Sequence, residues 1–227
     1  MHNKRVYVFD AYGTLFDVHA AVSRHAERIG PDAARLSQIW RAKQLEYSWV
    51  LGLAGRYEPF WRLTERALDH ALAACPAVEP TIRGDLLDAY RVLDAYPEVP
   101  DVLRALRAGG ARTGILSNGD HRMLGAAVRS AGIGDLLDHV LSVDAVRTFK
   151  TDPRVYALAT EAFETGHENI VFVSSNRWDI AGATAFGFAC IWVNRMGAPD
   201  EYPDLAPRRE IRDLTSLPAE ETMGGAG

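Results

Sequence analysis

Four short apolar runs of the sequence are followed by polar side chains that can do nucleophilic or ion-pairing chemistry. Asp10 ends "VYVFD", Ser117 and Asn118 end "GILSN", Lys150 ends "RTFK", and Asp179 ends "SSNRWD". A carboxylate can attack carbon or phosphorus as a nucleophile, and a neighbouring ammonium group keeps it ionised. Any one of these residues could instead cap a helix or end a turn. Together they indicate a catalytic cluster, provided that the fold brings the four runs to one place.

The elements that carry these residues alternate between strand and helix. Strand-like apolar runs occupy residues 5–9, 111–117, 138–143, 169–175 and 188–194. Helix-like segments occupy residues 99–110, 121–132, 152–166 and 177–187. This alternation predicts an α/β fold with a doubly wound, Rossmann-like parallel sheet. Because ligands bind beyond the carboxyl ends of the strands in such sheets, the four polar clusters are expected to converge there.

Residues 18–96 have a different pattern. They are rich in Ala, Leu, Arg and Glu at helical spacing and contain no convincing alternating strand. We therefore expect an all-helical cap domain, inserted after the first strand and lying over the carboxyl edge of the sheet. The core domain would then comprise residues 1–17 and 97–227. The last segment, residues 221–227, is expected to be disordered.

Charge and cysteine content exclude several classes of function. The 227 residues carry a net charge of −5 and no dense run of Lys or Arg, which argues against binding to nucleic acid or a membrane surface. No apolar stretch approaches the roughly 20 residues of a membrane span. Two cysteines without CxxC spacing or a neighbouring His cluster indicate neither a zinc site nor a disulfide framework. A cytoplasmic protein is expected.

The four clusters resemble the motifs of the haloacid dehalogenase superfamily. In its phosphatases an Asp two residues after the nucleophile is the general acid, and carboxylates of the fourth motif hold Mg²⁺. Tyr12 and Ser175 stand at those positions here. With these departures, the stretches "FDAYGTLFD", "WRAKQLEY", "LSNG", "KTDPRVYALA" and "FVSSNRWDIAGATAFGF" resemble the L-2-haloacid dehalogenases over nearly the whole chain.

This resemblance implies a hydrolase that converts (S)-2-haloalkanoic acids to (R)-2-hydroxyalkanoic acids and halide. Asp10 would displace the halide from C2 with inversion, and water would then hydrolyse the aspartyl ester at its carboxyl carbon. A halide leaves as a stable anion, whereas phosphoryl transfer needs an ion and an acid. No metal and no cofactor are therefore expected. Relatives of this kind are commonly dimers, so a homodimer is expected.

The resemblance also assigns catalytic roles. Thr14 would orient the nucleophile, Arg41 would receive the halide, and Lys150 would keep the nucleophile ionised. Asp179 would act through Lys150 or as the general base for the hydrolytic water, and the sequence leaves both roles open. The catalytic set is Asp10, Thr14, Arg41, Ser117, Lys150, Tyr156, Ser174, Asn176 and Asp179.

A second implied set binds the substrate through donors for its carboxylate and an apolar pocket around C2. It comprises Ala11, Tyr12, Arg41, Leu45, Phe60, Ser117, Asn118 and Trp178. Leu45 and Phe60 equally fit simple packing within the cap. Two departures from the family pattern fall nearby: Ala42 replaces the usual Gln and changes the pocket, and Thr151 replaces the usual Pro and leaves its loop less rigid.

Three other functions are compatible with parts of this pattern. One is hydrolytic opening of a strained cyclic amino acid such as azetidine-2-carboxylate, where an Asp again attacks a carbon beside a carboxylate. A Mg²⁺-dependent phosphatase is disfavoured by Tyr12 and Ser175. A non-catalytic binding module is disfavoured because Asp10, Arg41 and Lys150 are all present.

Overall fold

The computed structural model describes residues 5–217, so the expected disordered tail at 221–227 lies outside the described residues. Its centre is a six-stranded parallel sheet in the order β3-β2-β1-β4-β5-β6. The strands are β1 (Val6–Phe9), β2 (Arg112–Ser117), β3 (His139–Ser142), β4 (Ile170–Ser174), β5 (Ala189–Val193) and β6 (Arg209–Ile211). The predicted doubly wound α/β sheet is confirmed, and β6 is a strand that the sequence pattern did not predict.

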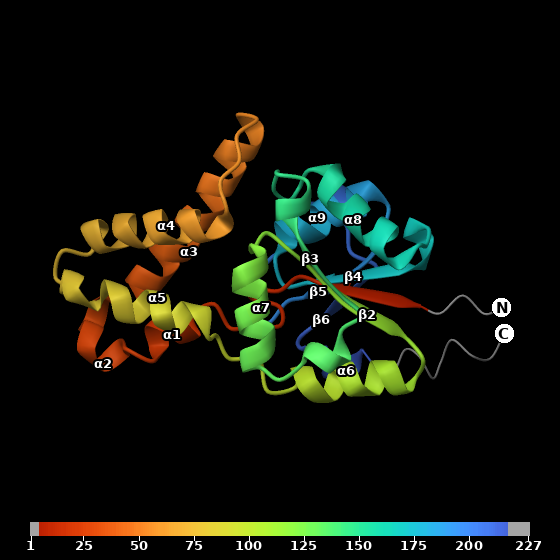
Figure 1. The fold of residues 1–227 in the computed structure, drawn as a ribbon, viewed down its shortest axis with the longest axis horizontal. Helices are drawn as coiled ribbons and strands as arrows, with labels where there is room; N and C mark the ends of the chain where they lie inside the picture. The colour runs from red at the N-terminus through yellow and green to blue at the C-terminus, as the bar shows by residue number, and fades with distance from the viewer. Residues whose placement is uncertain (1–4, 218–227) are drawn as a thin grey trace.

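Helices cover both faces of the sheet. Figure 1 shows α8 (Pro153–Phe163) and α9 (Arg177–Phe186) on one face and α6 (Val99–Ala108) on the other, with α7 (His121–Ser130) beside the strand ends. Every residue of the central strand β1 is buried, because both of its faces are covered. The strand order reverses at β1, so the crevice at the carboxyl ends of β1, β2 and β4 is where a ligand is expected to bind.

The chain between β1 and α6 forms five α-helices, which we call the helical cap. They are α1 (Ala20–Ser23), α2 (Ala26–Ile29), α3 (Ala33–Leu53), α4 (Phe60–Ala74) and α5 (Arg83–Arg91), and Figure 1 shows them to one side of the sheet. Helix α4 buries Phe60, Leu63, Thr64, Ala67, Leu68, Ala71 and Leu72. This spacing places the apolar stripe of α4 on the face that packs along α3.

Two neighbouring segments connect the helical cap to the sheet. The N–H of Asp17 donates to the carbonyl of Asp94 at 3.0 Å, and the N–H of Tyr96 donates to the carbonyl of Leu15 at 2.9 Å. Arg195, which follows β5, contacts both segments: it donates to the carbonyl of Thr14 at 3.1 Å and lies 3.7 Å from the centre of the Tyr96 ring. The two connecting segments therefore run side by side. No described helix is both long and apolar enough to span a lipid bilayer.

Candidate active site

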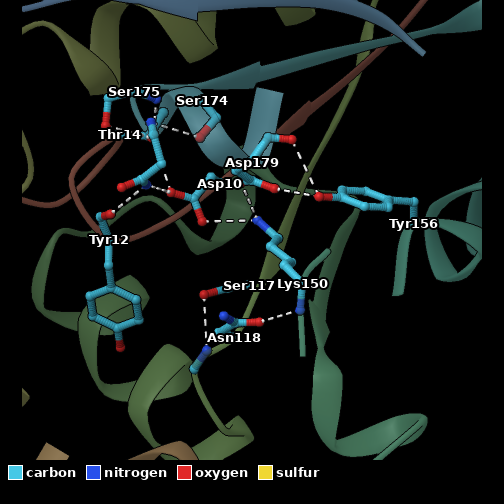
Figure 2. A network of polar contacts seen from close by, with 12 residues as sticks. Asp10, Tyr12, Thr14, Ser117, Asn118, Lys150, Tyr156, Ser174, Ser175 and Asp179 are labelled. Carbon is cyan, nitrogen blue, oxygen red and sulfur yellow. Dashed lines mark hydrogen bonds and ion pairs between the residues drawn. The ribbon is translucent and has the colours of Figure 1, made fainter. Parts of the chain in front are cut away.

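The carboxyl ends of the central strands bring the predicted polar residues together. Asp10 directly follows β1 and its N–H donates to the carbonyl of Val173 in β4 at 2.9 Å, which continues the pairing of the two strands. Asn118 follows β2, and Ser174 is the last residue of β4. Figure 2 shows these side chains gathered around Asp10 and Lys150.

Asp10 is buried and accepts hydrogen bonds on both carboxylate oxygens. Its Oδ1 accepts from Lys150 Nζ at 3.0 Å. Its Oδ2 accepts from the Thr14 hydroxyl at 3.1 Å and from the Asn176 amide at 2.8 Å. One cation and two neutral donors thus hold the carboxylate in a single orientation and stabilise its negative charge. The charged carboxylate is the form that can attack carbon.

Lys150 lies between two carboxylates. Its Nζ is 3.0 Å from Asp10 Oδ1 and 2.7 Å from Asp179 Oδ2, and its side chain is 0% exposed. Burial alone would lower the pKa of Lys150, but attraction to Asp10 and then to Asp179 outweighs burial and raises that pKa above its ordinary value. Lys150 is therefore an ammonium ion that supplies the positive charge beside the nucleophile.

Asp179 is the second buried carboxylate of the site. Its Oδ2 accepts from Lys150, and its Oδ1 accepts from the Tyr156 hydroxyl at 2.9 Å. Burial raises the pKa of Asp179 to about 6, because it outweighs the opposing attraction of Lys150 and is reinforced by the charge of Asp10. A carboxyl group in this range can take up and release a proton near neutral pH.

Gly182 allows Tyr156 to reach Asp179. A Cβ on Gly182 would lie 2.5 Å from the Tyr156 hydroxyl oxygen and 2.7 Å from Thr151 Cβ, which is closer than real Cβ contacts. This residue was not predicted to serve the site, because a glycine inside a helical segment carries no local sign of a close tertiary approach. Thr151 therefore packs against α9 as well as following Lys150 in the chain.

Asn118 presents an unused donor to the site. Its Oδ1 accepts the N–H of Lys150 at 2.9 Å, and it is buried. Among the described residues, none accepts a hydrogen bond from its Nδ2. The neighbouring Ser117 hydroxyl accepts the N–H of Gly119 at 3.1 Å. A buried N–H group is costly to leave unpaired, so the Asn118 amide is suited to an anionic or carbonyl oxygen of a ligand.

Arg41 brings a positive charge from the helical cap. It lies on α3 and donates to the carbonyl of Tyr12 at 3.2 Å and to Asn176 Oδ1 at 3.4 Å. Within the described part of the chain, no carboxylate forms an ion pair with Arg41. The guanidinium therefore keeps its charge available to an anion at this edge of the site.

The predicted apolar residues come from four parts of the chain. The Asn176 amide donates to the carbonyl of Tyr12 at 3.3 Å. Figure 2 shows the Tyr12 ring extending away from Asp10, and that ring stacks on the Tyr90 ring with the ring centres 5.8 Å apart. Ala11 is buried, and its carbonyl accepts N–H groups of the turn that follows. Ala11 and the Tyr12 ring are therefore packing groups beside the site.

Leu45, Phe60 and Trp178 lie on α3, α4 and α9. Phe60 is buried, with its ring 6.4 Å from that of Phe149, the residue before Lys150. Trp178 is half-buried and makes an edge-to-face contact with Trp49 at 5.6 Å. Leu45 is half-buried one helical turn after Arg41. A cavity of about 840 Å³ borders Trp178, Phe149 and Lys150.

The fourth strand end holds the nucleophile turn in place. Thr14 Oγ1 accepts the N–H of Ser175 at 2.8 Å, and Ser174 Oγ accepts the N–H of Asn176 at 3.1 Å. Gly13 has φ of +94°, and a Cβ there would lie 3.1 Å from Ser175 Oγ. Ser175 and Gly13 therefore position Thr14, a role that the sequence analysis did not assign. No cluster of three or more metal-ligating side chains occurs within residues 5–217.

A family model for haloacid dehalogenase-like hydrolases matches residues 4–187. The chain belongs to this family. It is 47% identical over 215 residues to (S)-2-haloacid dehalogenase 1 of Pseudomonas sp. (strain CBS-3), covering 94% of this chain and 95% of that protein. It is 41% identical over 214 residues to (S)-2-haloacid dehalogenase 4A of Burkholderia cepacia, covering 94% and 93%. The resemblance predicted from the sequence is confirmed.

Solved structures of family members have the same fold. A crystal structure of a dehalogenase matches with a TM-score of 0.92 at 41% identity and covers 96% of each chain. The L-2-haloacid dehalogenase of Xanthobacter autotrophicus, with chloropropionic acid covalently bound, matches with a TM-score of 0.88 at 34% identity. That match covers 99% of this chain and 100% of the other. A haloacid dehalogenase of this fold can therefore hold a haloacid as a covalent adduct.

Proposed function

We propose that this protein hydrolyses (S)-2-haloalkanoic acids to (R)-2-hydroxyalkanoic acids and halide. The observation that carries the proposal is the buried Asp10 carboxylate, which is held by Lys150 and by Asn176. Within residues 5–217, Asn118, whose Oδ1 accepts the N–H of Lys150, adds an unused donor, and Arg41, which donates to Asn176, adds a cation without a carboxylate partner. The relatives named above support the same reaction. They give no support to ring opening of a cyclic amino acid or to phosphate hydrolysis.

In the first step, a carboxylate oxygen of Asp10 attacks C2 from the side opposite the halogen. The new C–O bond forms as the carbon–halogen bond breaks, the halide takes the electron pair, and the configuration at C2 inverts. Asn118 donates to the substrate carboxylate and orients C2 toward Asp10. Arg41 stabilises the negative charge that develops on the leaving halide, because its guanidinium already stands at the site without a carboxylate partner.

In the second step, water attacks the carboxyl carbon of the Asp10 ester, the acyl C–O bond breaks, and the hydroxy acid is released. The water supplies the hydroxyl proton of the product, and one further proton leaves the site. We infer that Asp179 acts through Lys150, because Lys150 Nζ lies within hydrogen-bond distance of both carboxylates. Tyr156 holds the other oxygen of Asp179 and fixes its orientation.

The reaction is proposed to need no metal or cofactor. Hydrogen-bond donors, rather than further carboxylates, surround Asp10: Lys150, Thr14 and Asn176 occupy both of its oxygens. A departing halide needs no proton, so the position of Tyr12 needs no acid. The substrate and the released halide are then the small-molecule partners of the site.

Chloride release from the two enantiomers of 2-chloropropionate tests this function. We expect the (S) enantiomer to give chloride and (R)-lactate, with the (R) enantiomer at least about a hundredfold slower, because only one configuration places chlorine toward Arg41. EDTA is expected to leave the rate unchanged. Absence of chloride from both enantiomers would contradict the proposed reaction, and loss of activity in EDTA would contradict its independence of metal.

We also propose the domain division expected from the sequence, with residues 18–96 as the cap domain and residues 1–17 and 97–227 as the core. The helical cap from Ala20 to Arg91 supports this division, as does the bridge between Phe16 and Ala95 in the two connecting segments.

A reducing, cytoplasmic location is likewise proposed. Its support is that Cys75 and Cys190 are buried free thiols, and burial raises the pKa of Cys190 to about 12.

A homodimer is proposed on the apolar end of α3. Trp49, Val50 and Leu53 are 39%, 58% and 92% exposed, and Figure 1 shows this end of α3 projecting from the molecule. Contiguous exposed apolar side chains of this kind favour association. Light scattering is expected to give about twice the 25.0 kDa chain mass.

A charged side chain on this surface tests the dimer. Leu53→Glu is expected to give a monomer, because a carboxylate would be buried without a partner in the interface. Met196→Glu is the matched control, because Met196 is 90% exposed but lies in the loop after β5 and not on α3. A monomeric wild type, or equal behaviour of the two variants, would contradict this interface.

A further inference from the structure

Asp120 links a helix of the core to a helix of the helical cap. Its Oδ1 accepts the N–H groups of Arg122 and Met123 at 3.1 and 3.0 Å, which makes it the N-cap of α7. Its Oδ2 accepts the N–H of Trp61 at 3.1 Å, in the first turn of α4. Helix α4 has no side-chain N-cap of its own, because Pro59 precedes it. One buried carboxylate therefore serves the amino ends of both helices.

A second carboxylate fastens the same segment of the helical cap. Asp144 accepts from the Tyr57 hydroxyl and, at 3.1 Å, from the N–H of His121. The Tyr57 ring lies 5.2 Å from the ring of Phe149. Residues 57–61 are thus held against two loops at the carboxyl edge of the sheet, the loop after β2 and the loop after β3.

Asp120 and its partner Trp61 are each close in the sequence to a residue of the proposed substrate site. Phe60 precedes Trp61 and is buried against Phe149. Asn118, with its unused Nδ2 donor, lies two residues before Asp120. The intervening turn is held by its own hydrogen bonds, because the carbonyl of Gly119 accepts from the Ser142 hydroxyl at 2.7 Å. A shift of α4 relative to Asp120 would therefore change the separation of Phe60 and Asn118.

We propose that Asp120 is a positioning residue. It holds Phe60, the first residue of α4, at a fixed distance from the Asn118 donor. This inference rests on the proposed function, in which Asn118 binds the substrate carboxylate, and on the pocket role that the family resemblance gives to Phe60. Asp120 touches none of the reacting atoms, so it acts on substrate affinity and leaves the chemical step to Asp10 and Lys150. Losing its bond to Trp61 lowers the fraction of molecules with a formed pocket, and apparent affinity falls in proportion.

Asp120→Ser separates the two functions of the carboxylate. Serine remains a good N-cap for α7, but its side chain is one atom shorter and carries a single oxygen, so it cannot also serve Trp61. We expect KM for (S)-2-chloropropionate to rise about tenfold, the order expected for one charge-assisted hydrogen bond, with kcat changed less than about twofold. Asp213→Ser is the control, because Asp213 accepts the N–H of Thr215 in the core and contacts no part of the helical cap in the described structure.

Hydrogen–deuterium exchange over residues 57–63 tests the link without relying on activity. Exchange there is expected to be faster in Asp120→Ser and unchanged in Asp213→Ser. Unchanged exchange would overturn the link. A lower melting temperature with unchanged KM, or a fall in kcat alone, would show that Asp120 does not position the pocket. A wild-type protein that releases no chloride would overturn the proposed function, while exchange would still decide whether Asp120 holds α4.

Discussion

Asp10→Asn is expected to lower chloride release from (S)-2-chloropropionate by a factor on the order of 10⁴ or more. An amide is a poor nucleophile, and loss of a covalent nucleophile removes a whole reaction path rather than one stabilising contact. The replacement nearly preserves the shape of the side chain. One of its atoms becomes an N–H₂ group, which faces the donors Lys150, Thr14 and Asn176 that now serve a carboxylate. Initial rates of chloride release measure the effect.

Asp17→Asn is the matched control, because Asp17 lies in the same motif but its side chain accepts a hydrogen bond from the N–H of His19 at 2.9 Å. It is half-buried in the segment that leads to the helical cap. Its rate is expected to stay within about threefold of wild type, the modest effect of a surface substitution. An Asp10→Asn variant with more than a few per cent of wild-type activity would contradict the role of Asp10.

Isotope labelling identifies the bond that water attacks. In a single turnover in ¹⁸O-water, the label is expected in the Asp10 carboxylate and not in the hydroxy acid, because the oxygen bonded to C2 came from Asp10. Mass spectrometry of the peptide that contains Asp10 measures it. Label found in the product alone would mean that water attacks C2 directly, and Asp10 would then be a base.

The sheet could be predicted from the sequence because buried parallel strands are apolar on both faces. The run around Val6–Phe9 is continuous for this reason, and Gly13 and Asn118 mark the ends of strands β1 and β2. Strand β6 carries Arg209 and Glu210 and pairs only with β5 at the edge of the sheet. Ile211 is the one apolar residue of this three-residue strand, which is too little to form a recognisable apolar run. The pairing of β6 therefore follows from the tertiary fold.

The cluster around Asp10 could be anticipated because topology alone brings strand ends together. The individual contacts between the helical cap and the core could not be derived from the pattern, since they depend on how α3 and α4 pack against the sheet. Only the family resemblance placed Arg41 in the site. The bond from Arg41 to Asn176 crosses 135 residues of sequence, and the bond from Asp120 to Trp61 crosses 59. Gly182 is a similar case. A glycine is required there because the Tyr156 hydroxyl lies too close for a Cβ, and the helical pattern of α9 carries no information about the position of Tyr156.

Lys150→Met is expected to abolish dehalogenation and to lower the free energy of unfolding by about 3–5 kcal/mol at pH 8, because it leaves Asp10 and Asp179 buried without their cation. The loss is expected to be smaller at pH 5. Removing Lys150 raises the pKa of Asp179 further above about 6, so at pH 5 this carboxyl is protonated and carries no buried charge. Urea unfolding at the two pH values measures the difference.

The sign of this pH effect follows from proton binding. In the variant, the folded state binds a proton on Asp179 at a higher pH than the unfolded state does, so folding is favoured as the pH falls. Lys43→Met is the control: Lys43 pairs with Glu46 on the surface of α3, and its loss is expected to change the stability little at either pH value. A Lys150→Met variant with the same loss of stability at pH 5 and pH 8 would contradict the buried Asp179 charge as the cause. Other interactions of Lys150, such as its pairing with Asp10 and its approach to the Phe172 ring at 5.0 Å, would then account for the loss.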